Sequence, residues 1–296
     1  MKTTRVLLAA FVATVFLSGF TQGGITLRRT LTEGDVDKYT FEILSSQLVY
    51  SDMMGSEMPI EITTSGKVAI ITGKVDEEKQ EANVEIHVTD LKYDLGMVGG
   101  MMGDAEMPRE MKFTGKMNQF GEITNVSAVG GGQPGGMAGG MMMMFGGGAS
   151  ANMMFPSIKF PEKSLRIGDT WEIPIPANPM LGVGDEKMVA TIESQREEAG
   201  VPIYVIRVTA KHPTNVDMAR AMEAQGGAGG NEMAGMLANM KISGSMDSNT
   251  VVWVERESGR IIKQETLQKT KQKIDGGMFT ADVNGTTTVK MVRVAE

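Results

Sequence analysis

The clearest structural signal lies in residues 67–88, which read KVAIITGKVDEEKQEANVEIHV. Val84, Ile86 and Val88 alternate with polar residues, and this period of two is typical of a β-strand with one buried face. The run before them is also strand-like, and the polar residues 76–79 lie between the two runs as a turn. The stretch therefore predicts an antiparallel hairpin.

The same pattern of alternating strands and polar turns recurs along most of the chain. Tyr39, Phe41 and Ile43 share one face of a strand, and the WEIPI run at 171–175 predicts an edge strand because proline cannot donate to a ladder. Further hairpins are expected to turn near residues 119–121, 197–200, 257–259 and 275–277. The pattern predicts a mainly β protein made of antiparallel strands.

The first residues have the features of a secretory signal. Lys2 and Arg5 precede an apolar run at 6–17, which is too short for a membrane-spanning helix but suits a signal peptide. We expect residues 1–23 to be removed by a cut between about Gly19 and Gly24, leaving an exported, periplasmic or secreted protein. An uncleaved N-terminal anchor is the alternative, and no later segment resembles a membrane span.

The glycine-rich stretches divide the remaining chain. We predict two tandem antiparallel curved sheets or half-barrels, related by duplication because segments 114–123 and 252–261 share a strand–turn–glycine–isoleucine pattern. A single hairpin signal that simply recurs is the alternative. The expected units are an N-terminal β unit at 24–128, a flexible Gly/Met-rich linker at 129–158 and a C-terminal β unit at 159–296 with a helical insertion at about 214–241.

Short helices with methionine faces are expected in that insertion. Thr214 and Asn231 are suitable N-caps, and the methionines that follow have helical spacing. Such helices would form a mobile apolar lid. The lid candidates are Met218, Met222, Met233, Met236 and Met240.

Methionine is the strongest compositional bias, with 27 residues in a chain of 296. Thioethers favour Cu(I), so flexible methionine clusters could capture copper or silver. An adaptable apolar surface and a weakly constrained low-complexity insertion are the other interpretations. The methionines of the metal alternative are Met137, Met141, Met142, Met143, Met144, Met153 and Met154. His87 and His212 are far from them in sequence and are expected at the surface.

Composition excludes several function classes. The absence of cysteine removes disulfides, thiolate nucleophiles and thiolate metal sites. A net charge of −7 argues against nucleic acid as a partner. The chain has no P-loop, dinucleotide fingerprint, H-E-x-x-H motif or G-x-S-x-G elbow. No enzymatic activity and no cofactor are predicted.

Residues 160–171 carry the most distinctive motif, F-P…L-x-x-G-D-x-W. Gly168 and Asp169 predict a tight turn in which the Asp169 carboxylate accepts backbone N–H groups, and Trp171 begins the next strand by burying its ring. The motif resembles one in uncharacterised bacterial exported proteins of about 300 residues. That resemblance implies entry to a β unit and no catalytic role.

The expected layout is also similar to that of periplasmic carriers, in which a curved sheet holds a lipid or lipoprotein. The similarity implies an exported, non-enzymatic scaffold that binds a lipid, another apolar ligand or an envelope protein. Cu(I) or Ag(I) sequestration and a surface structural role without a small ligand are the alternatives.

Overall fold

A computed structural model describes residues 24–53, 55–102, 107–129, 155–175, 186–219, 239–277 and 279–294. The signal peptide predicted at 1–23 lies outside these residues. The strands are β1 (Val36–Ser51), β2 (Ser56–Asp76), β3 (Glu81–Asp94), β4 (Met111–Asn118), β5 (Ile123–Ala128), β6 (Thr170–Ile175), β7 (Glu186–Glu198), β8 (Val201–Asp217), β9 (Lys241–Glu255), β10 (Ile261–Asp275) and β11 (Thr280–Arg293).

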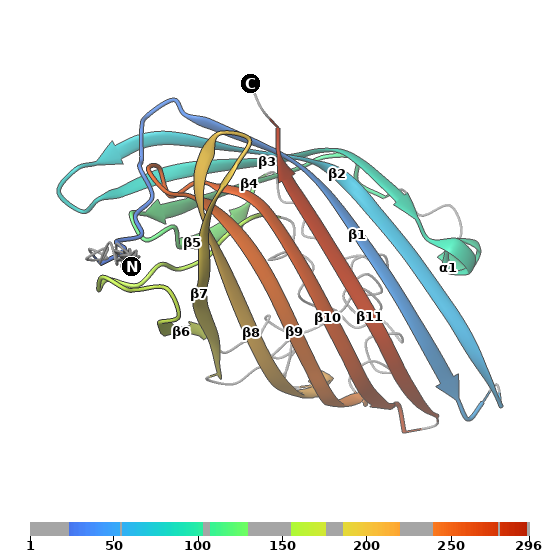
Figure 1. Ribbon diagram of the computed structural model, residues 1–296. Helices are drawn as coiled ribbons and strands as arrows, with labels where there is room; N and C mark the ends of the chain where they lie inside the picture. The colour runs from blue at the N-terminus through green and yellow to red at the C-terminus, as the bar shows by residue number, and fades with distance from the viewer. Residues whose placement is uncertain are drawn as a thin grey trace, which may run out of the picture.

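All described strands belong to one antiparallel sheet (Figure 1), with the order β5-β4-β3-β2-β1-β11-β10-β9-β8-β7-β6. The mainly β prediction is confirmed, but the prediction of two tandem sheets is wrong. The first and last strands pair along most of their length, from Tyr39 opposite Arg293 to Ser51 opposite Ala281. This pairing fuses the two halves of the chain, because an unpaired strand edge would leave backbone groups unsatisfied in each half.

The local hairpins form where the sequence predicted them, and β6 is an edge strand. Gly259 shows why one turn needs glycine. Its φ is 65°, and an added Cβ would lie 2.0 Å from the carbonyl oxygen of Arg28. The turn between β9 and β10 can therefore touch the backbone of the N-terminal segment only without a side chain at this position.

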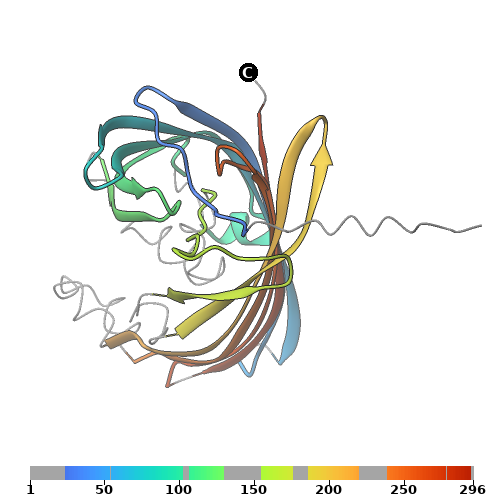
Figure 2. The ribbon, with the colours of Figure 1, turned by 60° about the vertical axis from the view of Figure 1, so that its left-hand side comes forward.

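The sheet bends into an open trough (Figure 2). Side chains alternate between a buried inner face and an exposed outer face, as in β1, where buried Tyr39 and Phe41 flank exposed Thr40. The end of the trough that carries the β4–β5 and β9–β10 turns is called the upper end. The lower end has the β1–β2 and β10–β11 turns, the end of β8 at Asp217 and the start of β9 at Lys241.

Residues 24–35 form a strap across the upper end. Backbone bonds join Arg29 to Gln119 in the β4–β5 turn, Thr30 to Ser258 in the β9–β10 turn, and Gly34 to Thr72 in β2. The strap thus connects three distant parts of the sheet.

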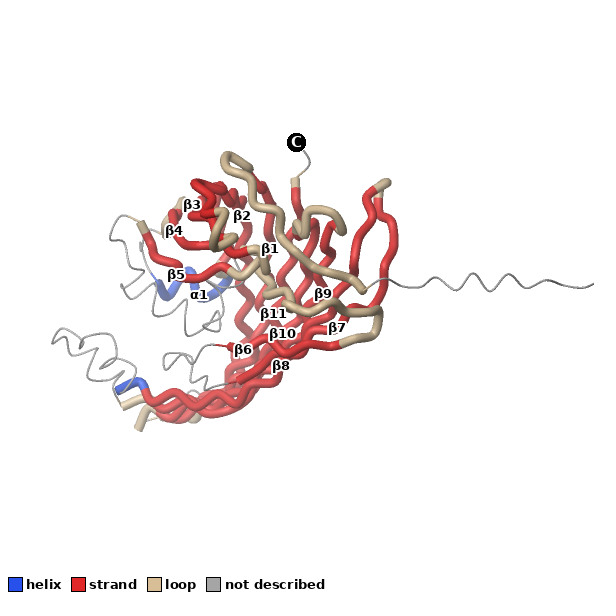
Figure 3. Tube along the Cα trace, turned by 90° about the vertical axis from the view of Figure 1, so that its left-hand side faces the viewer, coloured by secondary structure: helices blue, strands red, loops and turns tan. Residues whose placement is uncertain are grey.

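A second segment, residues 155–169, also crosses the upper end (Figure 3). It joins the β4–β5 turn to β7 through the bonds Phe160 N to Phe120 O and Gly168 N to Ile192 O. Its first residues lie within the range predicted as a linker, and Phe155 and Ile158 are buried there. Two apolar clusters fill the upper end, one under Leu27 and Phe160 and one under Phe155.

The described part of the predicted insertions contains little helix. A seven-residue helix, α1 (Gly96–Met102), follows β3. Thr214 was expected to cap a helix, and this prediction is wrong: it lies in β8, with its side chain buried. The ladder between β8 and β9 continues to Asp217 opposite Lys241, so the backbone groups at Thr214 are satisfied as a strand. Among the described residues, no helix has the length and apolar character that a membrane crossing requires.

Candidate functional site

The middle of the inner face is polar. Six inner-face side chains of β1, β10 and β11 lie at this level, and we call them the polar belt. They are Ser45, Gln47, Thr266, Gln268, Thr270 and Thr287, all less than 9% exposed. The register sets Ser45, Thr287 and Gln268 side by side in one row and places Gln47 and Thr270 on either side of Gly285 in the next. The belt therefore runs across the centre of the trough, where the two halves of the chain meet.

Gly285 gives the belt its shape. An added Cβ at this position would lie 2.8 Å from Cγ of Gln47 and 3.2 Å from the carbonyl oxygen of Ser46. The missing side chain leaves the space over β11 that the Gln47 side chain occupies. A larger residue at position 285 would displace this amide from the belt.

Hydrogen bonds connect the belt only in part. Thr287 Oγ1 donates to Ser45 Oγ at 3.2 Å, Gln47 Nε2 donates to the same oxygen at 3.3 Å, and Gln268 Nε2 donates to Thr270 Oγ1 at 3.5 Å. The hydroxyls of Thr250 and Thr266 lie 2.9 Å apart. The Gln268 bond is long for an amide group that can donate two hydrogen bonds and accept two.

Gln264 borders the belt on β10 and has an unsatisfied acceptor. Its side chain is 8% exposed, and its Oε1 has no hydrogen-bond donor in the described part of the chain. A buried amide oxygen without a donor costs on the order of 1–3 kcal/mol. The belt therefore offers hydrogen-bonding capacity that its own residues do not use.

A His–Glu pair lies on the inner face at the β7–β8 side, and Met246 of β9 lies between it and Thr270 of the belt. His212 and Glu186 lie opposite each other on the inner face, and Nδ1 of His212 contacts Oε2 of Glu186. The expectation of a surface histidine is wrong for His212, which is 7% exposed. The cause is the length of β8, which carries the two-residue alternation through Pro213 to its end. His87 lies on β3 with its ring 3.2 Å from the Glu85 carboxylate.

An apolar cluster lies below the belt. Val49, Ile60 and Ile274 are buried there, and they pack with two of the methionines that the sequence singled out. Met240 is buried, Met218 is half-buried, and the backbone N–H of Met218 donates to the carbonyl of Met240 at 3.1 Å. The structure thus brings these two lid candidates together at the lower end of the trough.

The remaining methionines named from the sequence lie outside the described residues. They are the lid candidates Met222, Met233 and Met236 and the metal candidates Met137, Met141, Met142, Met143, Met144, Met153 and Met154. Within the described residues, no three His, Asp or Glu side chains are grouped as metal ligands would be.

Gly168 and Asp169 of the motif lie at the end of the crossing segment 155–169, and Trp171 is the second residue of β6. Gly168 has a φ of 91°, and Asp169 Oδ2 accepts the backbone N–H of Arg166 at 2.8 Å. The Trp171 ring is buried, and its Nε1 donates to the carbonyl of Lys159 at 2.8 Å. The motif anchors the crossing segment to the sheet and lies away from the belt.

A charge network holds the strap at the upper end. Asp37 is 3% exposed. Its Oδ2 contacts Nη2 of Arg29, and its Oδ1 lies 3.5 Å from Nε of Arg293. Arg260 pairs with Asp35 in the strap. Burial lowers the pKa of Arg29, against the opposing effect of Asp37, and burial raises the pKa of Tyr39. Each arginine in the network has a carboxylate partner, so the network has a structural role.

Sequence reasoning missed the belt, although a signal for it exists. In β10 the residues at even positions from 264 to 272 are Gln, Thr, Gln, Thr and Gln, whereas those at odd positions from 263 to 273 are Lys, Glu, Leu, Lys, Lys and Lys. Buried strand faces normally carry apolar residues. An alternation of neutral polar with charged residues therefore indicates an inner face that is built for hydrogen bonding.

Comparisons with known proteins do not assign the chain to a family. No family model matches the chain, and no curated protein does. Among solved structures, the chain is similar to a DUF1329 family protein from Desulfovibrio piger, with 6% identity, coverage of 84% of this chain and 83% of that chain, and a TM-score of 0.13. A likeness at this TM-score supports no inference about the present protein.

Proposed function

We propose that the protein is an exported, non-enzymatic binding protein whose trough holds an amphiphilic ligand. The neutral polar head of the ligand lies on the polar belt, and its apolar part extends toward the cluster at the lower end. The observation that carries the proposal is the burial of six uncharged polar side chains at the centre of the inner face.

The chemistry of the belt selects a neutral head. Its amides and hydroxyls can donate and accept hydrogen bonds, and the ionisable groups nearest to it, His212 and Glu186, contact each other. A buried ionic head without a counter-charge would be strongly unfavourable here. Hydroxyl-rich heads such as sugars match this donor and acceptor set.

The apolar part of the ligand has a defined place. Val49 lies four residues beyond Ser45 along β1, which corresponds to about 13 Å at a rise of about 3.3 Å per residue. The cluster around Val49, Ile60 and Met240 begins there. A chain that starts at the belt and follows β1 would therefore reach apolar side chains, including flexible methionines that can adapt to its shape.

Calorimetric titration with three probes tests the proposal. Octyl glucoside combines a neutral head with an eight-carbon chain, octanoate has a charged head on a similar chain, and glucose has no chain. We expect saturable binding of octyl glucoside, at least about tenfold weaker binding of octanoate, which corresponds to about 1.4 kcal/mol, and none of glucose. Equal binding of octyl glucoside and octanoate would contradict the role of the belt.

A pair of variants on adjacent residues of β10 supplies the control. Gln268→Met removes an inner-face amide at nearly constant volume, and Lys269→Met changes the neighbouring outer-face residue. We expect only Gln268→Met to weaken octyl glucoside binding. Mass spectrometry of protein purified from its own host is a second test, and repeated absence of a co-purifying amphiphile would count against the proposal.

Sequestration of Cu(I) or Ag(I) and a structural role are the alternative functions that the sequence suggests. The metal alternative depends on methionines outside the described residues, and nothing in the described structure favours either alternative over the ligand-binding function.

A further inference from the structure

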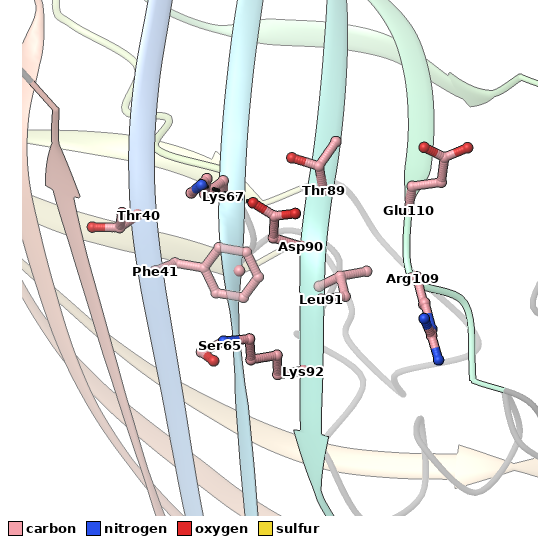
Figure 4. A pocket seen from close by; sticks show the side chains of 11 residues that line it. Thr40, Phe41, Ser65, Lys67, Thr89, Asp90, Leu91, Lys92, Arg109 and Glu110 are labelled. Atoms are coloured by element: carbon pink, nitrogen blue, oxygen red, sulfur yellow. Dashed lines mark ion pairs between the residues drawn. The ribbon is translucent and has the colours of Figure 1, made fainter.

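The outer face of the sheet has a pocket that is separate from the trough (Figure 4). It has a volume of about 1130 Å³ and lies where β1, β2, β3 and the residues before β4 meet. Exposed Thr40 and Lys67 lie on the side of the sheet opposite to the buried Tyr39 and Val68. A ligand here would therefore not enter the trough, and the inference is independent of the proposed function.

A β-bulge creates the pocket. Ser65 pairs with Lys92 and Lys67 pairs with Thr89, so Gly66 alone faces the two residues Asp90 and Leu91. Asp90 has a φ of 54°, in the left-handed region that side-chain-bearing residues seldom adopt. Bulges re-aim side chains and are common beside functional sites. Here the extra residue turns Asp90 and Lys92 toward the exposed face.

Glycine at position 66 permits this geometry. An added Cβ would lie 2.9 Å from Cε1 of Phe41, 3.0 Å from the carbonyl oxygen of Thr89 and 3.1 Å from Cδ2 of Leu91. Phe41 and Leu91 belong to the buried apolar cluster under Phe155, and they complete the lining of the pocket. The pocket therefore has a rigid, well-packed base.

The charges around this base are not balanced. Lys67 Nζ lies 2.8 Å from Asp90 Oδ2, and this pairing lowers the pKa of Asp90 and raises that of Lys67, so both are charged at neutral pH. Lys92 and Arg109 also line the pocket, and neither forms an ion pair within the described structure. Glu110 is the other acidic residue of the lining. An excess of cations is unusual on a chain with a net charge of −7.

Lys92 and Arg109 line the same pocket from neighbouring segments. The backbone N–H of Leu91 donates to the carbonyl of Arg109 at 3.2 Å, so the two cationic residues extend from neighbouring, hydrogen-bonded segments. In Figure 4 the Lys92 side chain extends toward Ser65, and the Arg109 side chain lies on the other side of Leu91. The charge of Lys92 also helps to lower the pKa of Asp90, after the larger effect of Lys67. The hydroxyls of Thr40, Ser65 and Thr89 line the same pocket.

We propose that this pocket binds a small organic anion through a carboxylate or phosphate group held by Lys92 and Arg109. An arginine guanidinium can bind either group with two parallel hydrogen bonds, while a lysine ammonium adds a mobile point charge. The threonine and serine hydroxyls supply further hydrogen bonds to polar substituents of the ligand.

Titrations followed by amide chemical shifts in NMR test the proposal on the full chain. Sodium succinate and sodium phosphate serve as probes at constant ionic strength, and sodium chloride serves as the reference salt. We expect saturable shifts of the amides of Gly66 and Leu91 with at least one probe and none with chloride. Saturation by succinate alone identifies a carboxylate site, and saturation by phosphate alone identifies a phosphate site.

Matched variants separate the pocket from a general effect of charge. Lys92→Gln and Arg109→Gln should each weaken binding of the active probe at least tenfold, whereas Lys271→Gln, on the outer face of β10, should leave it unchanged. Circular dichroism and the thermal midpoint verify that the variants are folded. Non-saturable shifts with both probes, or an equal loss of affinity in Lys271→Gln, would overturn the proposal.

Discussion

The upper end and the middle of the inner face are both buried, but by different chemistry. At the upper end, Leu27 of the strap and Phe160 of the crossing segment 155–169 pack against Ile206 and other apolar side chains of the sheet. In the middle, Gln268 and Thr287 are equally buried and lie in a row of hydroxyls and amides. Apolar burial stabilises a fold, whereas incomplete hydrogen bonding in a buried row weakens it. The contrast assigns a structural role to the upper end, and it agrees with the proposal that the middle binds a ligand.

The largest expected effect concerns the apolar packing of the crossing segment. Phe160→Ala should lower the free energy of unfolding by about 3–5 kcal/mol, because it leaves a cavity between this segment and the sheet. Urea denaturation measures the change. Val126→Ala, at an exposed position of the edge strand β5, is the control and should have little effect. A small loss for Phe160→Ala would show that the upper end is not what holds the trough together.

Asp37→Asn tests the charge network of the same end. It leaves Arg29 buried without its carboxylate partner, so the free energy of unfolding should fall by about 3 kcal/mol. The matched control is Asp90→Asn, which breaks an exposed pair on the outer face and should change stability little. Equal stability of the two variants would contradict a structural role for the network.

Gln268→Met tests the middle of the inner face, where we expect little or no loss in the free energy of unfolding. An apolar side chain of similar shape replaces an amide that makes one long hydrogen bond with the described residues. The free energy of unfolding should therefore stay within about 1 kcal/mol of the wild type or rise. Lys269→Met is again the control. A loss as large as that of Phe160→Ala would mean that the belt is structural and would break the contrast between the two regions.

The smallest expected effect lies at the lower end and depends on pH. Asp52 accepts bonds from the backbone N–H of Thr280 at 2.9 Å and from its hydroxyl at 3.1 Å, which tie the β1–β2 turn to β11. The backbone bond is the main cause of a lowered Asp52 pKa. Because the folded pKa lies below the unfolded value of 3.8, this contribution is present above that pH and is lost as the pH falls through the folded pKa.

Asp52→Asn should therefore show a smaller loss of stability between pH 5 and pH 3 than the wild type. Thermal unfolding at several pH values measures the difference. Identical pH profiles would show that the turn at the lower end does not depend on the ionised carboxylate.

The hairpins could be predicted because their determinants are local. Val84, Ile86 and Val88 alternate within one strand, and Gly121 and Gly259 mark tight turns between neighbouring strands. Periodicity of two and glycine at turns need no information from distant residues. The edge position of β6 could be predicted for the same reason, from the prolines in its own sequence.

The candidate site could not be predicted in the same way. Ser45, Thr287 and Gln268 come together only because the first and last strands pair, and no local pattern specifies which strands become neighbours. His212 and Thr214 were misjudged because a proline and a polar run suggested a strand end where the ladder with β9 continues. The bulge at Gly66 likewise depends on its fit against Phe41 and Leu91.

By itself, the sequence determined the class of secondary structure, the positions of most turns and the absence of cysteine chemistry, because each depends on residue type and short spacing. Only the tertiary structure decided that two predicted sheets are one trough, that a strap and a crossing segment cover its upper end, and that neutral polar side chains gather at its centre. These features depend on contacts between residues far apart in the chain, and such contacts are selected by the burial and pairing of the whole sheet.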